Sequence, residues 1–565
     1  MNKKLELTQE QKDIVNTVHD EDKVIQVQAY AGCSKTTTLV EVAKEIRRVD
    51  KKAKILYTVF NRSLMKEAES KFKKLRLNVE CRTVHSLGLK YFKEKVKNNI
   101  TIQNNFSPAD IEREIVKGYN SRTTRTTVDL YNVLDMLNEY LTLSYDRAEF
   151  RRYMMSQSEN LSPFKRDKVQ DIITISYNVL DYMKSKNIYT HSMYLKEIAC
   201  NNTATLDGYD YIFVDECQDT NIMLYNILQR MTYKKLYVVG DTYQTIYTFL
   251  NTINLFDYIN GTKYNLTTSF RITDYEVNLA HKLLEKCYGE QYTVHPITNI
   301  NIDKFKDKSN VSVLFRTNSS MFMFAVSLLK EMKDIKVNFL SPANPDKEAD
   351  FDKMYYDMLY FFAELLKSEG RLQDYNDMHC MFNIVKKYAP VDNLLPLAKA
   401  KNMSLYEYCK VCGTTSPELD RYFMVYNADH RDVIDTLQSF NINESKKTQS
   451  INFTLSTIHR YKGLESDYVI IGPDNWVLNT EEDINIMYVA CTRSRYWLDS
   501  SAINGLINEY VTKGCTHSRT VGNYDDFMVK VKEIIKNLQG NLSSNEFNNQ
   551  STEEDWVLDC NYIDE

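Results

Sequence analysis

Short apolar runs that end at polar or small residues recur along the chain, and this pattern is typical of buried strands in parallel sheets. The first run, at residues 24–27, leads into a small-residue loop at 29–37, and a helical pattern follows from Thr38 to Arg48. Further runs of this kind end near residues 60, 82, 214, 240, 315 and 471. A helical pattern also follows the second run, and the run near 315 starts a second unit, so the chain is predicted to be an α/β protein.

Two long segments interrupt this alternation. Residues 91–205 and 337–447 are mostly helical in pattern and carry no nucleotide-binding motif, so we interpret them as insertions. From about residue 537 the sequence becomes polar and acidic, which predicts a disordered tail. Within this tail, Trp556-Val557-Leu558 is a candidate partner-binding segment, and an idle tail is the alternative.

Composition narrows the class of protein. The 565 residues suffice for about three or four domains. With a net charge of −5 and a pI near 6.1, any nucleic-acid surface must be local. The eleven cysteines are scattered, with Cys409-x-x-Cys412 as the only CxxC pair, which predicts free thiols and no zinc site. Neither a membrane span nor a signal peptide is recognised, so we expect an intracellular protein, cytoplasmic or, in a eukaryote, nuclear.

The loop at 29–37 has the context of a phosphate-binding loop. Backbone N–H groups at a helix start attract phosphates, Lys35 reaches the β- and γ-phosphates, and the Thr36 hydroxyl can hold Mg²⁺. The match is incomplete, because Ala29 and Ser34 stand where such loops usually have glycine. On this motif alone, an ordinary strand-to-helix turn is the alternative.

Two later strand ends supply further groups that an ATPase needs. Asp215 and Glu216 follow the apolar run at 209–214, where a charge costs free energy unless a metal or a partner uses it. Asp215 is therefore a candidate Mg²⁺ ligand, and Glu216 is a candidate for positioning and deprotonating the attacking water. Gln244 is predicted to sense the γ-phosphate, and Arg271 to contact it.

Several candidate binding residues have plain structural alternatives. Gln11, at the capping-box position of a predicted first helix, either caps that helix or reads adenine with its amide. Phe270 offers a stacking surface to the adenine, and Phe249 either stacks on a nucleobase or packs in the core. Thr83 and His85, at a strand end, suit contacts to a sugar–phosphate backbone but are also ordinary turn residues.

In chain order, the motifs of this sequence resemble those of the UvrD/Rep group of superfamily 1 helicases. They are Asp-Glu-x-Gln-Asp at 215–219, Gly-Asp-x-x-Gln-x-Ile-Tyr at 240–247, Thr-Ile-His-x-x-Lys-Gly-Leu-Glu at 457–465 and Tyr-Val-Ala-x-Thr-Arg at 488–493. The resemblance runs from Gln11 to Arg493. In detail the sequence resembles the F-box DNA helicase branch, without a recognisable F-box, at Thr190-His191, Tyr194-Leu195-Lys196 and Ser269-Phe270-Arg271.

The resemblance implies two RecA-like P-loop domains with parallel sheets, each carrying a mostly helical inserted subdomain. ATP would bind in the cleft between the two domains. The implied first domain, 1A, comprises 1–90 and 206–275, with 91–205 as its insertion, 1B. The implied second domain, 2A, comprises 276–336 and 448–536, with 337–447 as its insertion, 2B, and 537–565 as the acidic tail.

Motif matches to the family also imply residue roles. In the ATP site, Thr36 and Asp215 would hold Mg²⁺, and Glu465 would contact the ribose. The residues that would bind the nucleotide are Gln11, Gly32, Cys33, Ser34, Lys35, Thr36, Thr37, Phe270, Arg271, Glu465 and Arg493. The catalytic residues would be Lys35, Glu216, Gln244, Arg271 and Arg493. The residues facing DNA would be Phe60, Asn61, Thr83, His85, Phe249, Thr457 and His459. Two departures from the family pattern are Ser34, in place of a loop glycine, and Leu250-Asn251-Thr252, in place of Arg-Gly-Ala.

The implied function is that of an ATP-dependent 3′–5′ DNA helicase or translocase, a DNA-stimulated ATPase acting on single-stranded DNA and DNA junctions. Two alternatives stay open: a translocase that strips proteins and unwinds weakly, and an ATP-gated DNA-binding switch. We expect no membrane contact, a candidate protein partner at the acidic tail, and a monomer. The residues alone do not distinguish a preference for DNA from one for RNA. They also leave the pathway open among repair, recombination, replication and defence.

Overall fold

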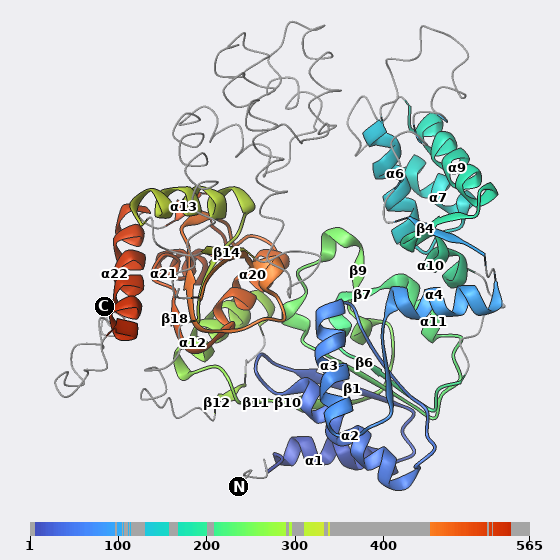
Figure 1. The fold of residues 1–565 in the computed structure, drawn as a ribbon, viewed down its shortest axis with the longest axis horizontal. Helices are drawn as coiled ribbons and strands as arrows, with labels where there is room; N and C mark the ends of the chain where they lie inside the picture. The colour runs from blue at the N-terminus through green and yellow to red at the C-terminus, as the bar shows by residue number, and fades with distance from the viewer. Residues whose placement is uncertain are drawn as a thin grey trace, which may run out of the picture.

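The computed structural model describes residues 6–96, 99–103, 106, 111, 114, 130–157, 168–200, 208–289, 293–296, 310–332, 337–339, 452–516, 519–521 and 524–543. The predicted insertion at 337–447, apart from its first three residues, lies outside this set. So do Cys409, Cys412 and the tail segment 556–558. Two α/β units built on parallel sheets make up most of the described chain (Figure 1). The predicted α/β class with parallel sheets is confirmed.

The first sheet has six parallel strands in the order β10-β1-β8-β6-β2-β3. These strands are β1 Val24–Ala29, β2 Ile55–Val59, β3 Val79–Thr83, β6 Tyr211–Val214, β8 Lys235–Gly240 and β10 Thr262–Leu266. Because side chains alternate along a strand, Tyr211 and Phe213 enter one core while Ile212 and Val214 enter the other. The loops after β1, β6 and β8 leave the same edge of the sheet, where open α/β sheets bind ligands.

Helices cover both faces of this sheet. One face carries α1 Gln9–Asn16, α2 Lys35–Val49 and α3 Arg62–Lys74. The other carries α4 Val84–Lys95, α10 His191–Cys200 and α11 Ile222–Leu228. Thr8 and Gln11 form the predicted capping box at the start of α1. Asn61 and Thr83 cap α3 and α4, so two of the predicted DNA-facing residues also fix helix starts.

A group of helices stands over α4 and α11 of the first unit (Figure 1). It comprises α6 Leu130–Thr142, α7 Arg147–Ser156, α9 Val169–Ser185 and α10, with the short parallel strands β4 Thr101–Gln103 and β5 Ile188–Thr190. Its apolar core is continuous with one face of the first sheet. The predicted domain boundary after residue 90 falls within α4, and the domain limits remain a prediction.

The second sheet has five parallel strands in the order β14-β15-β13-β16-β18. They are β13 Asn310–Phe315, β14 Val337–Phe339, β15 Asn452–Thr457, β16 Ser466–Ile471 and β18 Ser494–Asp499. One face packs on α12 Asp274–Tyr288, α20 Glu481–Cys491 and α21 Asn504–Lys513, and the other on α13 Asn318–Glu331 and α22 Tyr524–Ser543. The short helix α19 Ile458–Tyr461 follows β15 at the edge that faces the first unit.

Three further two-stranded pairs complete the described strands. They are β7 Thr220–Asn221 with β9 Thr252–Ile253, β11 Thr268–Ser269 with β12 His295–Pro296, and β17 Asp474–Trp476 with β19 Arg519–Val521. Among the helices that the structure describes, none combines the length and the apolar character that a membrane crossing needs.

Helix α22 runs past residue 537, where the sequence predicts the start of the acidic tail, and the tail limit stays a prediction. Helix α22 continues to Ser543. Phe527, Val531 and Ile535 form a buried stripe against the second sheet, and Leu538 continues that helical spacing along the sequence. The apolar period therefore outlasts the point at which the composition turns polar.

Candidate functional site

The loop between β1 and α2 has the backbone shape of an anion-binding loop. Gly32 and Ser34 both have positive φ angles, +76° and +58°, and successive N–H groups in such turns form a concave anion site. A Cβ on Gly32 would lie 2.4 Å from Ser269 Oγ and 2.8 Å from Arg271 Cβ. The Phe270 N–H also donates to the Gly32 carbonyl at 3.0 Å. The segment after β10 therefore closes directly over this loop.

The two residues that open α2 contact the acidic pair after β6. Lys35 Nζ lies 3.0 Å from Glu216 Oε2, and the Thr36 hydroxyl donates to Asp215 Oδ2 at 3.2 Å. Tyr57, on the neighbouring strand β2, donates its hydroxyl to the same Asp215 oxygen at 2.7 Å. A hydroxyl beside a buried carboxylate is an oxygen donor set of the kind that Mg²⁺ prefers, so Thr36 and Asp215 fit this ion.

Burial and charge set the protonation of these groups. Burial raises the pKa of Asp215, and the Glu216 carboxylate raises it further. Burial acts in the same direction on Glu216, but Lys35 and Lys462 outweigh it and hold its pKa at about 2. Burial alone would lower the pKa of Lys35, yet the carboxylates of Glu216, Asp241 and Asp215 raise it overall. At neutral pH, Glu216 is therefore an ionised carboxylate held beside an ammonium group.

Groups from the second sheet reach into the same site. Arg493, which lies between α20 and β18 and is 2% exposed, donates from Nη2 to Gln244 Oε1 at 3.2 Å. Gln244 follows β8 in the first unit and donates from Nε2 to Asp241 Oδ2 at 2.7 Å. Lys462, after α19, forms a buried ion pair with Asp219 of the first unit and donates to the Gln244 carbonyl. The two units therefore share one polar site.

Arg271 also crosses between the units. Its Nη1 lies 3.1 Å from Glu465 Oε2, and Arg495 Nε lies 2.7 Å from the other oxygen of the same carboxylate. Burial, together with the nearby Arg271 cation, lowers the pKa of Arg493 to about 10. Arg271, Glu465 and Arg493 are thus brought close to the phosphate loop, as the motif match predicts for an ATP site.

The predicted adenine contacts have partners within the protein. Gln11 Nε2 donates to Thr38 Oγ1 at 3.1 Å, and its Oε1 accepts from the Thr8 N–H at 3.1 Å. The capping interpretation is thereby observed, and the adenine role stays a prediction. Cys33 is buried in the loop, and Thr37 lies partly exposed in the first turn of α2.

Three of the predicted DNA-facing residues lie where the two units meet. Phe60 follows β2, Thr457 ends β15 and His459 lies in α19. The ring of Tyr247 lies between two of them, with centroids 5.8 Å from Phe60 and 6.1 Å from His459. Its hydroxyl donates to the His459 carbonyl at 2.6 Å. Tyr247 follows Gln244 closely, so this row of rings adjoins the candidate ATP site.

The other predicted DNA-facing residues lie at the ends of β2 and β3. Asn61 and Thr83 serve as helix caps there, and the ring of His85 packs edge-on to His191 of α10 at 6.1 Å. Burial, with His191 nearby, lowers the pKa of His85 to about 4, so its imidazole is neutral at physiological pH. The backbone of Phe249 lies in the 3-10 helix Thr248–Leu250, but its side chain is outside the described set.

Two family models match the chain. Residues 7–258 match the UvrD/REP helicase N-terminal domain, and residues 452–498 match a UvrD-like helicase C-terminal domain. Together these matches cover more than half of the 565 residues. The chain belongs to the UvrD/REP helicase family. The resemblance found in the sequence motifs is thereby confirmed.

Two curated relatives are similar to this UvrD/REP helicase chain over most of its length. F-box DNA helicase 1 of Gallus gallus is 23% identical over 525 residues, which cover 87% of this chain and 48% of that protein. F-box DNA helicase protein 1 of Schizosaccharomyces pombe is 25% identical over 556 residues, which cover 90% of this chain and 58% of that protein. The chain spans about half the length of these relatives.

Several polar residues of this UvrD/REP helicase site were not singled out from the sequence. Gln218 donates to Glu216 Oε2 at 2.7 Å and accepts from the Asp241 N–H at 3.0 Å, so it ties two strand ends together. Gln218 and Asp241, like Tyr247, lie inside the family motifs, which is the signal that could have identified them. Tyr57 lies outside them, and only the pairing of β2 with β6 places it beside Asp215.

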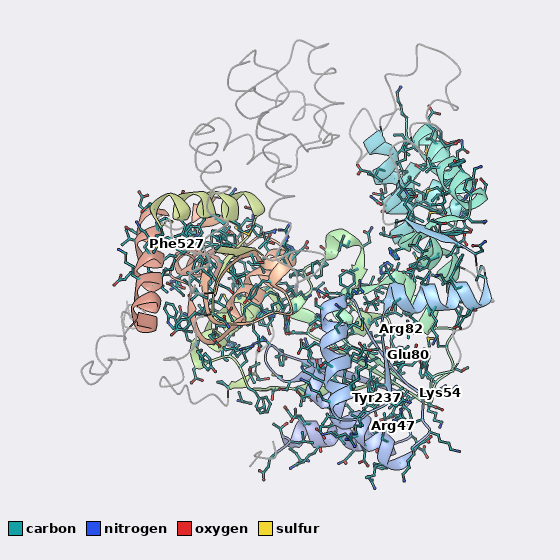
Figure 2. All side chains as sticks on the ribbon, in the orientation of Figure 1. Arg47, Lys54, Glu80, Arg82, Tyr237 and Phe527 are labelled. Atoms are coloured by element: carbon teal, nitrogen blue, oxygen red, sulfur yellow. The ribbon has the colours of Figure 1, made fainter. Side chains whose placement is uncertain are left out.

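A separate cavity of about 580 Å³ lies at the amino-terminal ends of β2 and β3. Among its lining residues, Glu80 is paired with Lys90 at 2.8 Å and also contacts Arg82 at 2.9 Å. Figure 2 labels Arg47, Lys54 and Glu80 on the side of the first unit that is turned away from the second. This cavity is therefore distinct from the site that the two units share.

Proposed function

We propose that this chain is an ATP-dependent DNA helicase and single-stranded DNA translocase that moves 3′ to 5′. The observation that carries the proposal is that Arg493, from the second unit, contacts Gln244 in the buried site of Lys35 and Glu216. A site assembled from two units changes whenever the units move, which is what a motor requires. Both relatives are named as DNA helicases, which supports DNA as the substrate.

In the proposed site, each unit supplies part of the phosphate contact. Lys35, Gln244, Arg271 and Arg493 would bind the γ-phosphate, and Glu216 would orient and deprotonate the attacking water. A Mg²⁺ ion held by Thr36 and Asp215 would neutralise charge on the β- and γ-phosphates. Glu465 would hold the ribose, with Gln11 and Phe270 at the adenine.

The row of rings beside this site supports the proposed DNA path. Phe60 and His459 lie on different units and are joined through Tyr247, three residues beyond Gln244. Aromatic rings stack on bases of any identity, so they suit a motor that moves along DNA without reading sequence. Relative movement of the two units would shift Phe60 against His459.

Two other functions use the same residues. A translocase that strips proteins would need the same ATP site and differ only in weak unwinding. An ATP-gated switch would hydrolyse slowly, and the ionised Glu216, with Arg271 and Arg493 both in the shared site, disfavours it.

The proposal is tested with purified chain and single-stranded DNA. ATP turnover should rise at least about tenfold on adding DNA, a change of about 1.4 kcal/mol in the barrier. Streptavidin should be displaced from a 5′-biotinylated strand faster than from a 3′-biotinylated one, since a 3′–5′ motor runs toward the 5′ end. Turnover without DNA stimulation would favour the switch. Displacement without unwinding of a tailed duplex would favour the stripping translocase.

A further inference from the structure

Tyr488 places its hydroxyl between two groups of the opposite unit. It lies in α20 of the second unit, and its side chain is fully buried. The hydroxyl oxygen accepts from the Ala31 N–H of the phosphate loop at 3.2 Å. The same hydroxyl donates to Asp241 Oδ2, after β8, at 3.0 Å. One side chain of the second unit therefore contacts two loops of the first.

The hydrogen bonds continue from Asp241 to the arginine of the second unit. Asp241 Oδ2 also accepts from Gln244 Nε2 at 2.7 Å, and Gln244 Oε1 accepts from Arg493 Nη2 at 3.2 Å. Tyr488 lies in the last turn of α20, and Arg493 follows two residues after the helix ends at Cys491, so the hydrogen bonds begin and end in one short segment of the second unit. These hydrogen bonds connect the phosphate loop with Gln244 and Arg493, two of the four residues proposed to bind the γ-phosphate.

We propose that Tyr488 is a positioning residue that couples docking of the second unit to the phosphate loop and to Gln244. Its hydroxyl fixes the Asp241 carboxylate, which orients the Gln244 amide so that its carbonyl oxygen faces Arg493. This inference rests on the proposed ATPase function and adds a residue to which no role has been assigned.

The hydroxyl, rather than the ring, carries this role. The ring packs edge-on against Tyr243 at 6.1 Å, and a phenylalanine would preserve that contact. Without the hydroxyl, the Ala31 N–H and one lone pair of the buried Asp241 carboxylate each lose a partner. Hydrogen bonds to charged groups contribute more than neutral ones, so the loss should fall on the orientation of Asp241.

The test compares Tyr488→Phe with Tyr461→Phe. Tyr461 is also a buried tyrosine of the second unit, but its hydroxyl bonds to Ser312, 2.9 Å away in the same unit. With saturating single-stranded DNA, kcat of Tyr488→Phe should fall roughly tenfold or more while KM for ATP stays within about threefold. Hydrogen exchange at the Ala31 amide should become faster. Tyr461→Phe should match the parent in both measurements.

Two results would overturn the role of Tyr488. One is a kcat for Tyr488→Phe within about twofold of the parent, and the other is an equal loss in Tyr461→Phe, which would make the effect structural. Unchanged exchange at Ala31 would show that the hydroxyl does not hold the phosphate loop. A parent chain without ATP turnover would refute the proposed function instead. The rate of hydrogen exchange at the Ala31 amide would then test by itself whether the Tyr488 hydroxyl holds the phosphate loop.

Discussion

Ser34 and Asn251 occupy positions where the family pattern has glycine, and both retain a glycine-like backbone. Ser34 has a φ of +58°, and Asn251 has a φ of +54°. Asparagine tolerates this region well, and Asn251 also donates to Thr142 Oγ1 of α6 at 2.8 Å. Ser34 makes no capping hydrogen bond to α2. The sequence identified both departures, but only the structure shows that the backbone shape persists and that Asn251 gains a contact.

Replacing Ser34 with glycine should stabilise the chain. Relief of the strained φ should stabilise the folded chain by about 1–3 kcal/mol. The greater freedom of glycine in the unfolded chain offsets about 0.4–1 kcal/mol of this gain. We therefore expect a gain near 1 kcal/mol in urea unfolding, with ATP turnover changed by less than roughly tenfold. Ser34→Ala keeps the Cβ and loses the hydroxyl, so it should turn over ATP more slowly than the parent. An alanine variant as active as the parent would show that the hydroxyl contributes nothing.

Glu216→Gln should separate ATP binding from hydrolysis. The amide preserves the side-chain shape and can still accept from Gln218, but it cannot act as a base. Turnover should fall by roughly two orders of magnitude or more, while a fluorescent ATP analogue still binds. The same variant also controls for contaminating ATPases in the preparation. Turnover within about tenfold of the parent would remove Glu216 from this role.

At the scale of elements, the close approach of strand ends shapes the site. Gly240 ends β8, where an added Cβ would lie 2.4 Å from Gln218 Oε1 and 2.6 Å from Cys217 Sγ. This approach lets Gln218 reach both the Asp241 N–H and Glu216. Glycine is scarce in the sequence, 15 in 565 residues, so a glycine at the end of an apolar run is informative in itself.

Gly240→Ala should therefore lower the free energy of unfolding by about 1–3 kcal/mol, because the loop carrying Gln218 must move. ATP turnover should fall as well, since the acidic pair moves with that loop. Gly505→Ala is the matched control. Gly505 lies within α21, and among the described residues nothing beyond its chain neighbours and the nearby helix backbone lies within 4 Å of the added Cβ. That variant should be stabilised by up to about 1 kcal/mol. Equal effects in the two variants would contradict the argument.

Lys196 ties α10 to the end of α6. Its buried ammonium group donates to the Tyr140 carbonyl at 3.0 Å and to the Leu143 carbonyl, and it lies 4.4 Å from the centre of the Tyr140 ring. Cationic groups stabilise the carboxyl end of a helix. Burial nevertheless lowers the pKa of Lys196 to about 8, from its ordinary value of 10.5.

The contribution of Lys196 to stability should therefore rise with pH between about 8 and 10.5. In this window the unfolded chain still binds the proton that the folded chain has released, so raising the pH favours folding. The measurement is urea unfolding of the parent and Lys196→Met from pH 7 to 10, and the stability difference isolates this residue. The prediction would be contradicted if the free energy of unfolding of the parent, relative to that of Lys196→Met, stayed constant or fell as the pH rises.

Local patterns predicted much of the fold and part of the site. The apolar runs located β1, β2, β3, β6 and β8 of the first sheet and β13 and β16 of the second, but not β10, β14, β15 or β18. Thr8 caps the first helix as predicted, because such signals act over a few residues. Tyr57 could not be predicted in its role, since its partner Asp215 is 158 residues away and is brought near by strand pairing. Tyr488 likewise contacts Ala31 across 457 residues. The roles of the predicted site residues remain predictions.

At the scale of the whole molecule, the two units meet through polar and apolar groups together. Ala31, Tyr243 and Ile246 of the first unit join the apolar core of the second. Around them lie the buried ion pair of Lys462 with Asp219 and the more exposed pair of Arg271 with Glu465. Buried ion pairs add little net stability but are costly to break on one side. They therefore suit a contact that must be specific in its closed form and still separable.

The Lys462–Asp219 pair is expected to control docking of the two units. Burial raises the pKa of Asp219 to about 6 against the opposing effect of Lys462. Lys462→Met would leave that carboxyl group buried and unpaired, at a cost of about 3–5 kcal/mol, most of which the chain avoids by undocking. Hydrogen exchange should then become faster on both sides of the contact, and DNA-stimulated turnover should fall.

The double variant Lys462→Met with Asp219→Asn distinguishes an electrostatic contact from lost packing. It removes both charges, so docking should recover much of what Lys462→Met alone loses, and the double-mutant cycle should show a coupling of at least about 1 kcal/mol. Turnover should recover less than docking, because Lys462 also donates to the Gln244 carbonyl and lowers the pKa of Glu216. Additive losses in the two single variants would show that the pair does not hold the units together.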